Sequence, residues 1–191
     1  TKESKLIPVV SIVGESDTGK TTLIEKIIPE LIERGYRVAT IKHDVHGFEI
    51  DHEGKDSWRH KRAGACTTVL SSPWQVVVVE DVKKDHDITE LQEKYIRDLD
   101  IILTEGYKRN RYPKIEVFRA DRKGDLISRG DENLLAVVGD KPPQINVPCF
   151  DGSDIIGIAN LIENSFLRCG EQPSTTIGRF LPAGIDAIMS R

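Results

Sequence analysis

A glycine-rich segment near the start of the chain carries the residue types that bind phosphate. Gly14, Gly19, Lys20 and Thr21 match the pattern Gly-x-x-x-x-Gly-Lys-(Ser/Thr). The glycines let the backbone turn its N–H groups toward an anion, the lysine is a mobile cation for the β- and γ-phosphates, and the threonine hydroxyl can ligate Mg²⁺. We therefore predict a phosphate-binding loop (P-loop) made, with the residue after it, of Gly14, Glu15, Ser16, Asp17, Thr18, Gly19, Lys20, Thr21 and Thr22.

The elements around this loop are those that a P-loop requires. Leu6–Val13 is a short apolar, β-branched run, which predicts a buried strand. Residues 22–33 carry apolar side chains at helical spacing, and Gly35 is a suitable C-cap. Pro29 inside this helix predicts a kink or a local break, because proline lacks the backbone donor. Since Glu15 follows Gly14, the loop lacks the early lysine of partition-type ATPases.

A bound Mg²⁺ also needs a carboxylate at the end of a core strand. Asp100 and Glu105 flank the predicted strand 101–104 on opposite sides. Ligands of parallel sheets bind at the carboxyl ends of the strands, so Glu105 is the better candidate. Asp44 follows the predicted strand 36–42 at the same edge, and we predict it as a further metal or metal-water ligand.

The rest of the chain alternates strands with helices, which predicts an α/β fold with a mainly parallel sheet covered on both faces. We expect one nucleotide-binding domain over residues 1–168 and a tail over 169–191 that is loose or serves for docking. The further expected elements are strands 67–70, 76–79, 115–118 and 135–138 and helices 56–63, 89–99 and 153–166, the last capped by Asp151 or Ser153.

Composition narrows the class of protein. The 191 residues have a formal net charge of -4, which gives non-specific nucleic-acid binding no support. No apolar stretch reaches the roughly 20 residues that cross a bilayer, and the N-terminal residues do not resemble a signal peptide. The three cysteines have no zinc-binding spacing. We therefore expect a cytoplasmic protein that binds neither membrane nor nucleic acid.

Two basic segments have more than one interpretation. Residues 55–62 are a solvated helix face or a contact for an anion, for which arginine is well suited. Lys108, Arg109, Arg111 and Lys114 form a basic turn that covers phosphates, binds an acidic partner or is simply solvated.

Two other groups of residues remain open in the same way. Asp140 follows a late strand and is either part of a simple turn or the acceptor for the N1 and N2 donors of guanine. His43, His46 and His52 are ordinary loop residues or, less simply, metal ligands at irregular spacing.

Four segments together resemble the molybdopterin-guanine dinucleotide biosynthesis protein B (MobB) family, over roughly residues 8–165. They are the P-loop ending Thr18-Gly19-Lys20-Thr21-Thr22, then residues 35–43 (GYRVATIKH), then 54–65 (GKDSWRHKRAGA) after Asp51, and then 104–108 (TEGYK). The third is far more discriminating than the P-loop. The place of Arg59 in it implies that Arg59 is the residue of the basic run that contacts an anion, either a nucleotide phosphate or a pterin phosphate. The family often has a richer histidine cluster after Lys42-His43 than this chain has.

The resemblance implies a P-loop NTPase fold, a three-layer sandwich with a strand or hairpin extension over Lys42–Gly54 used for dimerisation. It also implies a GTP- and Mg²⁺-binding adaptor that assists the guanylyltransferase attaching GMP to molybdopterin. Such a protein is a homodimer, contacts molybdopterin-bearing proteins and is at most a weak GTPase. The alternatives are a small-molecule P-loop kinase, with residues 108–114 as a lid, and a metallochaperone GTPase that uses the histidines of residues 43–52.

Overall fold

The computed structural model describes residues 6–44, 46–48, 51–121 and 124–168, and the chain divides into two compact units. Within the described residues, the first unit comprises 6–44 and 92–168, and the second comprises 46–48 and 51–91. No described helix is long and apolar enough to cross a membrane.

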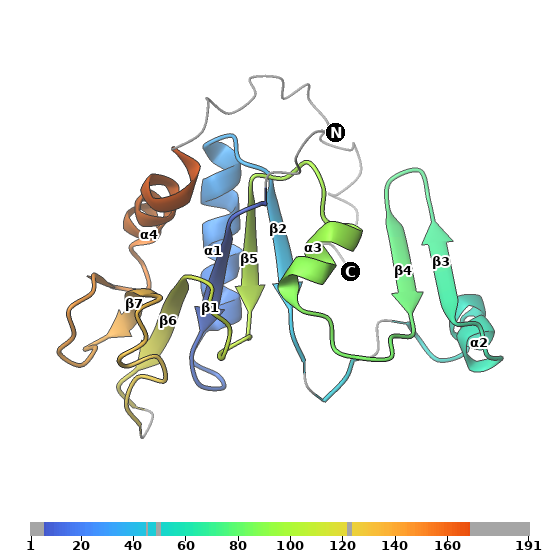
Figure 1. Ribbon diagram of the computed structural model, residues 1–191, viewed down its shortest axis with the longest axis horizontal. Coiled ribbons are helices and arrows are strands. Elements are labelled where there is room, and N and C mark those ends of the chain that lie inside the picture. The colour runs from blue at the N-terminus through green and yellow to red at the C-terminus, as the bar shows by residue number, and fades with distance from the viewer. Residues whose placement is uncertain (1–5, 45, 49–50, 122–123, 169–191) are drawn as a thin grey trace, which may run out of the picture. The chain divides into compact units, whose positions relative to one another are not determined.

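The first unit is built on a six-stranded sheet of order β2-β5-β1-β6-β7-β8, in which every pairing is parallel (Figure 1). This confirms the predicted α/β fold with a mainly parallel sheet. All carboxyl ends of the strands therefore lie at one edge of the sheet. The strands are β1 (Val9–Val13), β2 (Val38–Lys42), β5 (Ile101–Glu105), β6 (Lys114–Arg119), β7 (Leu134–Asp140) and β8 (Cys149–Phe150).

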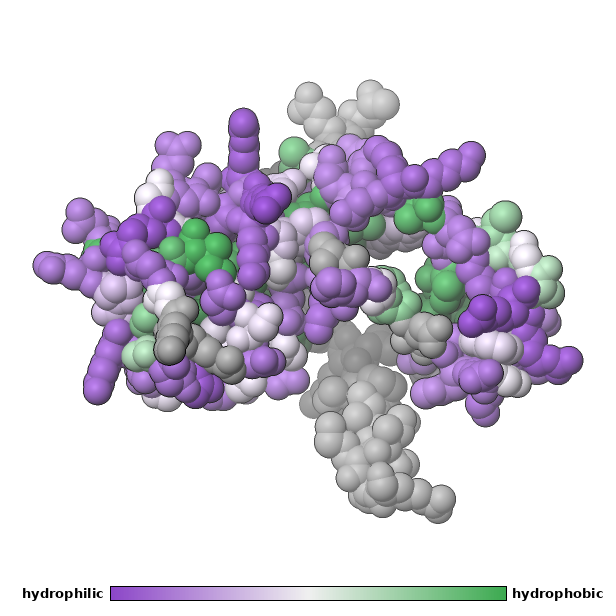
Figure 2. Space-filling model, turned by 90° about the horizontal axis from the view of Figure 1, so that it is seen from below, coloured by the Kyte–Doolittle hydropathy of each residue, from purple (hydrophilic) through white to green (hydrophobic). Residues whose placement is uncertain are grey.

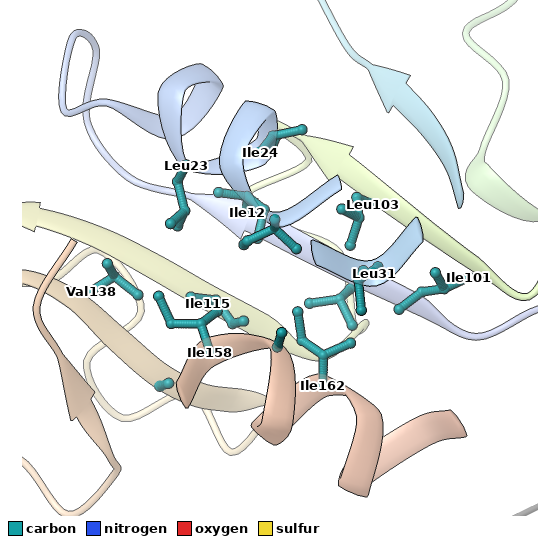
Figure 3. Packing of buried hydrophobic residues seen from close by; sticks show 14 of the residues in the cluster. Ile12, Leu23, Ile24, Leu31, Ile101, Leu103, Ile115, Val138, Ile158 and Ile162 are labelled. Atoms are coloured by element: carbon teal, nitrogen blue, oxygen red, sulfur yellow. The ribbon is translucent and has the colours of Figure 1, made fainter. Parts of the chain in front are cut away.

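Helices α1 (Lys20–Glu33) and α4 (Ile155–Ile162) pack together on one face of this sheet. Figure 3 shows apolar side chains from both helices and from β1, β5, β6 and β7 meeting in one core. Each fully buried aliphatic side chain contributes about 1.5–3 kcal/mol. The core positions with no exposed surface include Val10, Ile12, Ile27, Leu31, Ile101, Leu103, Ile115, Ile158 and Ile162.

Helix α1 runs unbroken through Pro29, so of the two outcomes expected there, a kink or a local break, the break is wrong and the kink stays a prediction. Proline in a helix interior costs about 3 kcal/mol. Pro29 itself is exposed, whereas Ile27 and Leu31 on either side of it are fully buried. Burial of these two side chains holds both halves of the helix against the sheet and offsets the missing hydrogen bond.

Two helix ends differ from the sequence prediction for local reasons. The N-cap of α4 is Asp154, whose carboxylate accepts a hydrogen bond from the Gly157 N–H at 2.9 Å. Asp151 instead accepts from Ser153 in the turn before the helix. Helix α3 (Ile88–Tyr95) ends earlier than expected, and Asp98, with φ 56°, takes a left-handed conformation that a helix cannot continue.

The second unit holds α2 (Asp56–Arg62) and an antiparallel hairpin of β3 (Thr67–Ser71) and β4 (Val76–Glu80). The extension predicted over Lys42–Gly54 is therefore misplaced. The residues of that range that the structure describes beyond Lys42 form no strand, whereas valine-rich β4 pairs with β3. β-Branched residues fit a pleated surface better than a glycine-containing polar segment does.

The hairpin exposes apolar side chains on one of its faces. Val69 lies opposite Val78, and Val76 follows on the same face; their exposed fractions are 58%, 45% and 62%. Figure 2 shows hydrophobic side chains interrupting the otherwise hydrophilic surface. Aligned valines at such exposure are a surface that another protein could cover.

A partly buried polar cluster joins the end of α1 to the π-helical turn η1 (Glu163–Leu167) that follows α4. The Glu163 carboxylate accepts hydrogen bonds from Tyr36 Oη and Arg34 Nη1, both at 2.9 Å. Burial alone would raise the pKa of Glu163, but the hydrogen bond from Tyr36 and the positive charges of Arg168 and Arg34 outweigh it and lower that pKa.

The ionised Glu163 should therefore stabilise the fold only above its lowered pKa. This contribution is complete above the ordinary glutamate pKa of about 4.3 and is lost as the pH falls through the folded-state value. We expect Glu163→Gln to lower the free energy of unfolding at pH 7 by about 1.5–3 kcal/mol, the range for hydrogen bonds to charged groups. Urea unfolding should show the deficit shrinking toward pH 3. The exposed control Glu33→Gln should show no deficit, and a deficit that does not change with pH would contradict the assignment.

Candidate functional site

The P-loop connects the end of β1 to the start of α1 and has the backbone shape that only glycine allows at its two fixed positions. Gly14 has φ 144° and Gly19 has φ 99°. A Cβ atom on Gly14 would lie 2.5 Å from the Val117 carbonyl oxygen and 2.9 Å from Thr18 Oγ1. Any side chain at position 14 would therefore push β6 and the loop apart.

Two side chains of the P-loop donate hydrogen bonds to the backbone of the loop itself. Thr18 Oγ1 donates to the Glu15 carbonyl at 3.0 Å, and Lys20 Nζ donates to the same oxygen at 2.5 Å. Burial lowers the pKa of Lys20, the positive charge of Lys108 lowers it further, and the charge of Glu105 opposes both. The ammonium thus lacks full solvation, so a phosphate placed beside it would gain strongly from its charge.

Thr21 and Glu105 meet across the gap between α1 and β5, as the metal-site prediction requires. Thr21 Oγ1 lies 3.0 Å and 3.1 Å from the two carboxylate oxygens of Glu105. Lys42 Nζ, from the end of β2, lies 3.9 Å from Glu105 Oε1. Asp100 sits at the other end of β5, where it accepts from the Arg37 N–H at 2.7 Å. The geometry therefore favours Glu105 over Asp100 as the metal carboxylate.

Asp44 and the histidines lie in the segment after β2. Asp44 is exposed at the same edge of the sheet as Glu105, and its role at a metal stays a prediction. The His43 ring stacks on Tyr107, with ring centroids 4.5 Å apart. In the part of the chain that the structure describes, no group of three or more His, Cys, Asp or Glu residues could hold a metal. A hydrated Mg²⁺, which keeps several waters, needs only one or two protein ligands.

The basic turn separates into two kinds of residue. Lys108, Arg109 and Arg111 are exposed. Lys114 is fully buried and forms an ion pair with Asp131 at 2.9 Å. The interpretation of Lys114 as a solvated or ligand-binding cation is therefore wrong, because its ammonium is already used inside the protein.

Asp140 ends β7 at the carboxyl edge of the sheet and is exposed. Its carboxylate accepts from the Ala120 N–H at 3.4 Å, a weak contact that leaves acceptor capacity. Gly139 before it passes so close to β6 that a Cβ atom would lie 1.9 Å from the Phe118 carbonyl oxygen. The close approach of β7 to β6 therefore fixes the backbone directly before Asp140, the residue that we predict to contact guanine. The role of Asp140 in binding guanine stays a prediction.

Arg59 belongs to α2 in the second unit, where its guanidinium lies 3.8 Å from Asp56 Oδ1. Its phosphate contact stays a prediction. The same unit holds a shallow hollow of about 400 Å³, which Arg59 does not line; its lining residues are Asp51, Lys55, Asp56, Ser57, His60, Thr68, Val69 and Leu70. The buried Thr68 hydroxyl has no hydrogen-bond partner among the described residues.

Sequence reasoning missed a polar cluster on the sheet face opposite α1. Ser11 Oγ accepts hydrogen bonds from Thr104 Oγ1 and Asn110 Nδ2, both at 2.9 Å. Ser11 and Thr104 have no exposed surface. The sequence did contain a signal for this cluster: one hydroxyl residue stands in each of two mainly apolar strands, Ser11 in β1 and Thr104 in β5.

Comparison with known proteins identifies relatives along most of the chain. Residues 9–140 match the family model described as molybdopterin guanine dinucleotide synthesis protein B. A Haemophilus influenzae protein named molybdopterin-guanine dinucleotide biosynthesis adapter protein is 40% identical over 83% of this chain and 89% of its own length. An Escherichia coli protein of the same name is 34% identical over 82% and 92%.

Solved structures agree with this match. The crystal structure of a molybdopterin-guanine biosynthesis protein B superimposes with a TM-score of 0.66 at 30% identity, covering 82% of this chain and 97% of the other. Bacillus subtilis MobB gives a TM-score of 0.67 at 27% identity, covering 84% and 98%.

The Thr21–Glu105 contact predicts how the site depends on Mg²⁺. If Glu105 holds the hydrated ion, Glu105→Gln should reduce the gain in triphosphate affinity on adding Mg²⁺ by about tenfold, equivalent to roughly 1.4 kcal/mol. Isothermal titration calorimetry with and without Mg²⁺ measures this gain. Asp100→Asn, which neutralises the carboxylate at the opposite end of the same strand, is the matched control. Equal effects of the two substitutions would refute the metal assignment.

Proposed function

The chain belongs to the molybdopterin guanine dinucleotide synthesis protein B family, and from this premise we propose that it is a GTP-binding adapter in molybdenum cofactor biosynthesis. In this role it assists the attachment of GMP to molybdopterin. The observation that carries the nucleotide part of the proposal is the meeting of Thr21 and Glu105 beside the P-loop.

GTP with Mg²⁺ is the proposed ligand. The P-loop and Lys20 would hold its phosphates, and Thr21 and Glu105 its metal ion, with Asp44 as a further contact through water. Asp140 would accept the guanine donors, since β7 ends at the same edge of the sheet as β1. Arg59 would contribute an anion contact, to the nucleotide or to a pterin phosphate.

Any hydrolysis by this site is proposed to be weak. Glu105 is engaged by the Thr21 hydroxyl and faces Lys42, which suits metal binding better than proton abstraction from water. A slow site would keep GTP bound while a partner enzyme uses its own substrates. This is the behaviour of an adapter rather than of a motor or a switch with fast turnover.

A small-molecule kinase remains the second candidate because Lys108, Arg109 and Arg111 are exposed in the segment after Glu105. The burial of Lys114 removes one cation from that possible lid. A metallochaperone has less support, since the part of the chain described here offers no cluster of three metal-binding side chains.

The proposed partners are the guanylyltransferase, molybdopterin-bearing proteins and a second copy of the chain. The exposed valines of the β3–β4 hairpin support a homodimer, because such a face is stabilised when another copy covers it. The compartment is proposed to be the cytoplasm, which suits the free, exposed thiols of Cys66 and Cys149.

Nucleotide binding tests the proposal directly. We expect the protein to bind GTP with Mg²⁺ at least tenfold more tightly than ATP, and Asp140→Asn to remove most of this preference. Lys20→Ala should weaken GTP binding by about 100-fold or more, roughly 2.7 kcal/mol, whereas Lys26→Ala on the exposed side of the same helix should leave it unchanged. Preference for ATP together with fast phosphate transfer to an acceptor would establish the kinase instead.

The dimer is tested on the valine face of the hairpin. Val78→Lys places a charge opposite Val69 and should convert the dimer into a monomer, because a buried unpaired charge is strongly unfavourable. Val82→Lys introduces the same charge at an exposed position beyond β4 and should leave the dimer intact. Light scattering after size-exclusion chromatography measures both masses. A dimeric Val78→Lys protein would show that this face is not the interface.

A further inference from the structure

The connection from β5 to β6 crosses the face of β1 without forming a helix. β1 lies between these two strands, and all three are parallel, so residues 106–113 must pass over β1. Parallel crossovers usually need a dozen or more residues and a helix. This shorter connection, which we call the crossover segment, instead needs side chains to satisfy its backbone polar groups.

Hydrogen bonds fix both ends and the middle of the crossover segment on β1. The Gly106 N–H donates to the Ile12 carbonyl at 3.3 Å, and the Pro113 carbonyl accepts from the Ser11 N–H at 2.8 Å. Asn110 in the middle donates from its side-chain amide to Ser11 Oγ. The segment is therefore attached to the strand that leads directly into the P-loop.

Lys114 is the buried anchor of this arrangement. Its ammonium donates to the carbonyl oxygens of Asn110 at 2.5 Å and Tyr112 at 3.3 Å and pairs with Asp131 at 2.9 Å. All three donors of the ammonium are thus satisfied without water. Two of the three acceptors belong to the crossover segment, so the charge of Lys114 holds the segment in its present path.

A second buried charge secures the partner of Lys114. The Glu116 carboxylate, 2% exposed, accepts from the Ile127 N–H at 2.7 Å and the Ser128 N–H at 2.8 Å. Asp131 follows in the same stretch of chain, and its N–H donates to the Ser128 carbonyl at 3.0 Å. The position of Asp131 against Lys114 is therefore itself fixed.

The start of the crossover segment presents the exposed Lys108 just after the carboxyl end of β5, at the edge of the sheet where β1 leads into the P-loop. Tyr107 has φ 53°, and its ring is stacked on His43, which fixes the backbone just before Lys108. Lys108 lies three residues after Glu105, the carboxylate that meets Thr21. The Lys108 charge also lowers the pKa of Lys20, so the two ammonium groups lie within electrostatic range.

We propose that Lys108 is a second phosphate-binding cation of this site, positioned by the buried Lys114, and that it favours a triphosphate over a diphosphate. The proposal rests on the nucleotide part of the proposed function. Two ammonium groups that repel each other in the free protein gain most from the longest and most highly charged phosphate chain. The terminal phosphate of GTP is the group that GDP lacks, so the effect of Lys108 should differ between them.

Lys108→Met tests this, because it removes the charge and keeps most of the side-chain volume. We expect the affinity for GTP and for inorganic tripolyphosphate to fall roughly tenfold, and that for GDP and pyrophosphate by less than threefold, as for one ammonium–phosphate contact near the surface. Lys108→Arg should restore most of the triphosphate preference. Arg111→Met, in the same segment and with the same loss of charge, is the matched control.

The positioning role of Lys114 has its own readout. Lys114→Met should reduce the ratio of GTP to GDP affinity about as much as Lys108→Met, and the double substitution should lower it no further. If Lys114→Met does not fold, Asn110→Ala, which cuts the tie to Ser11, should lower the same ratio. If Lys114 had only a structural role, its substitution would weaken the binding of GTP and of GDP equally. That result would overturn the positioning role.

The outcomes separate this inference from the proposed function. Equal losses for Lys108→Met and Arg111→Met, or equal losses for triphosphate and diphosphate, would overturn the role of Lys108. Tripolyphosphate and pyrophosphate carry no base, so the difference in their affinities tests Lys108 independently of guanine recognition. If the Lys108 effect holds while GTP and ATP bind alike, the guanine assignment fails and the present inference stands.

Discussion

The parallel pairing of β1 with β5 is the constraint on which the site depends. Its register places Ile12 beside Glu105, so the end of β5 lies level with the last residues before the P-loop. The Thr21 hydroxyl, at the start of α1, then meets the Glu105 carboxylate. A slip of the pairing by one residue would turn Glu105 to the other face of the sheet and separate them. The apolar side chains of α1 and β5 fix this register, so the hydrophobic core determines the spacing of the proposed metal ligands.

The face of the sheet opposite α1 and α4 buries charged and hydroxyl side chains beside its apolar ones, because a different kind of chain covers part of it. Helices α1 and α4 satisfy their own backbone groups and offer aliphatic side chains, so the face beneath them is apolar. The crossover segment has too few residues for a helix, and its carbonyl groups need donors from elsewhere. Lys114 supplies these donors, as Glu116 supplies acceptors for the N–H groups of the next segment. Buried charges on this face are thus a consequence of a short connection.

What could be predicted from the sequence followed from local patterns and one topological rule. The P-loop is a continuous motif, and Glu105 was selected because ligands bind at the carboxyl edge of a parallel sheet. The burial of Lys114 was not predictable in this way, because it depends on Asp131, which reaches it only through the fold. The N-cap of α4 was missed among neighbouring residues that can all cap a helix, and only hydrogen-bond geometry separates Asp154 from Asp151 and Ser153. The hairpin strands were expected, but the extension was assigned to a glycine-containing segment nearby.

The chain leaves the first unit at the edge of the candidate site itself. His43, directly after β2, donates its N–H to the Glu105 carbonyl at 3.1 Å and stacks its ring on Tyr107. Gly106 lies between these two contacts, and a Cβ atom there would come within 3.3 Å of the His43 carbonyl oxygen. His43 therefore contacts both the end of β5, which carries Glu105, and Tyr107, which precedes Lys108. The second unit follows His43 along the chain, so the backbone that leads to it begins at a residue bonded to the end of β5, the strand that carries Glu105.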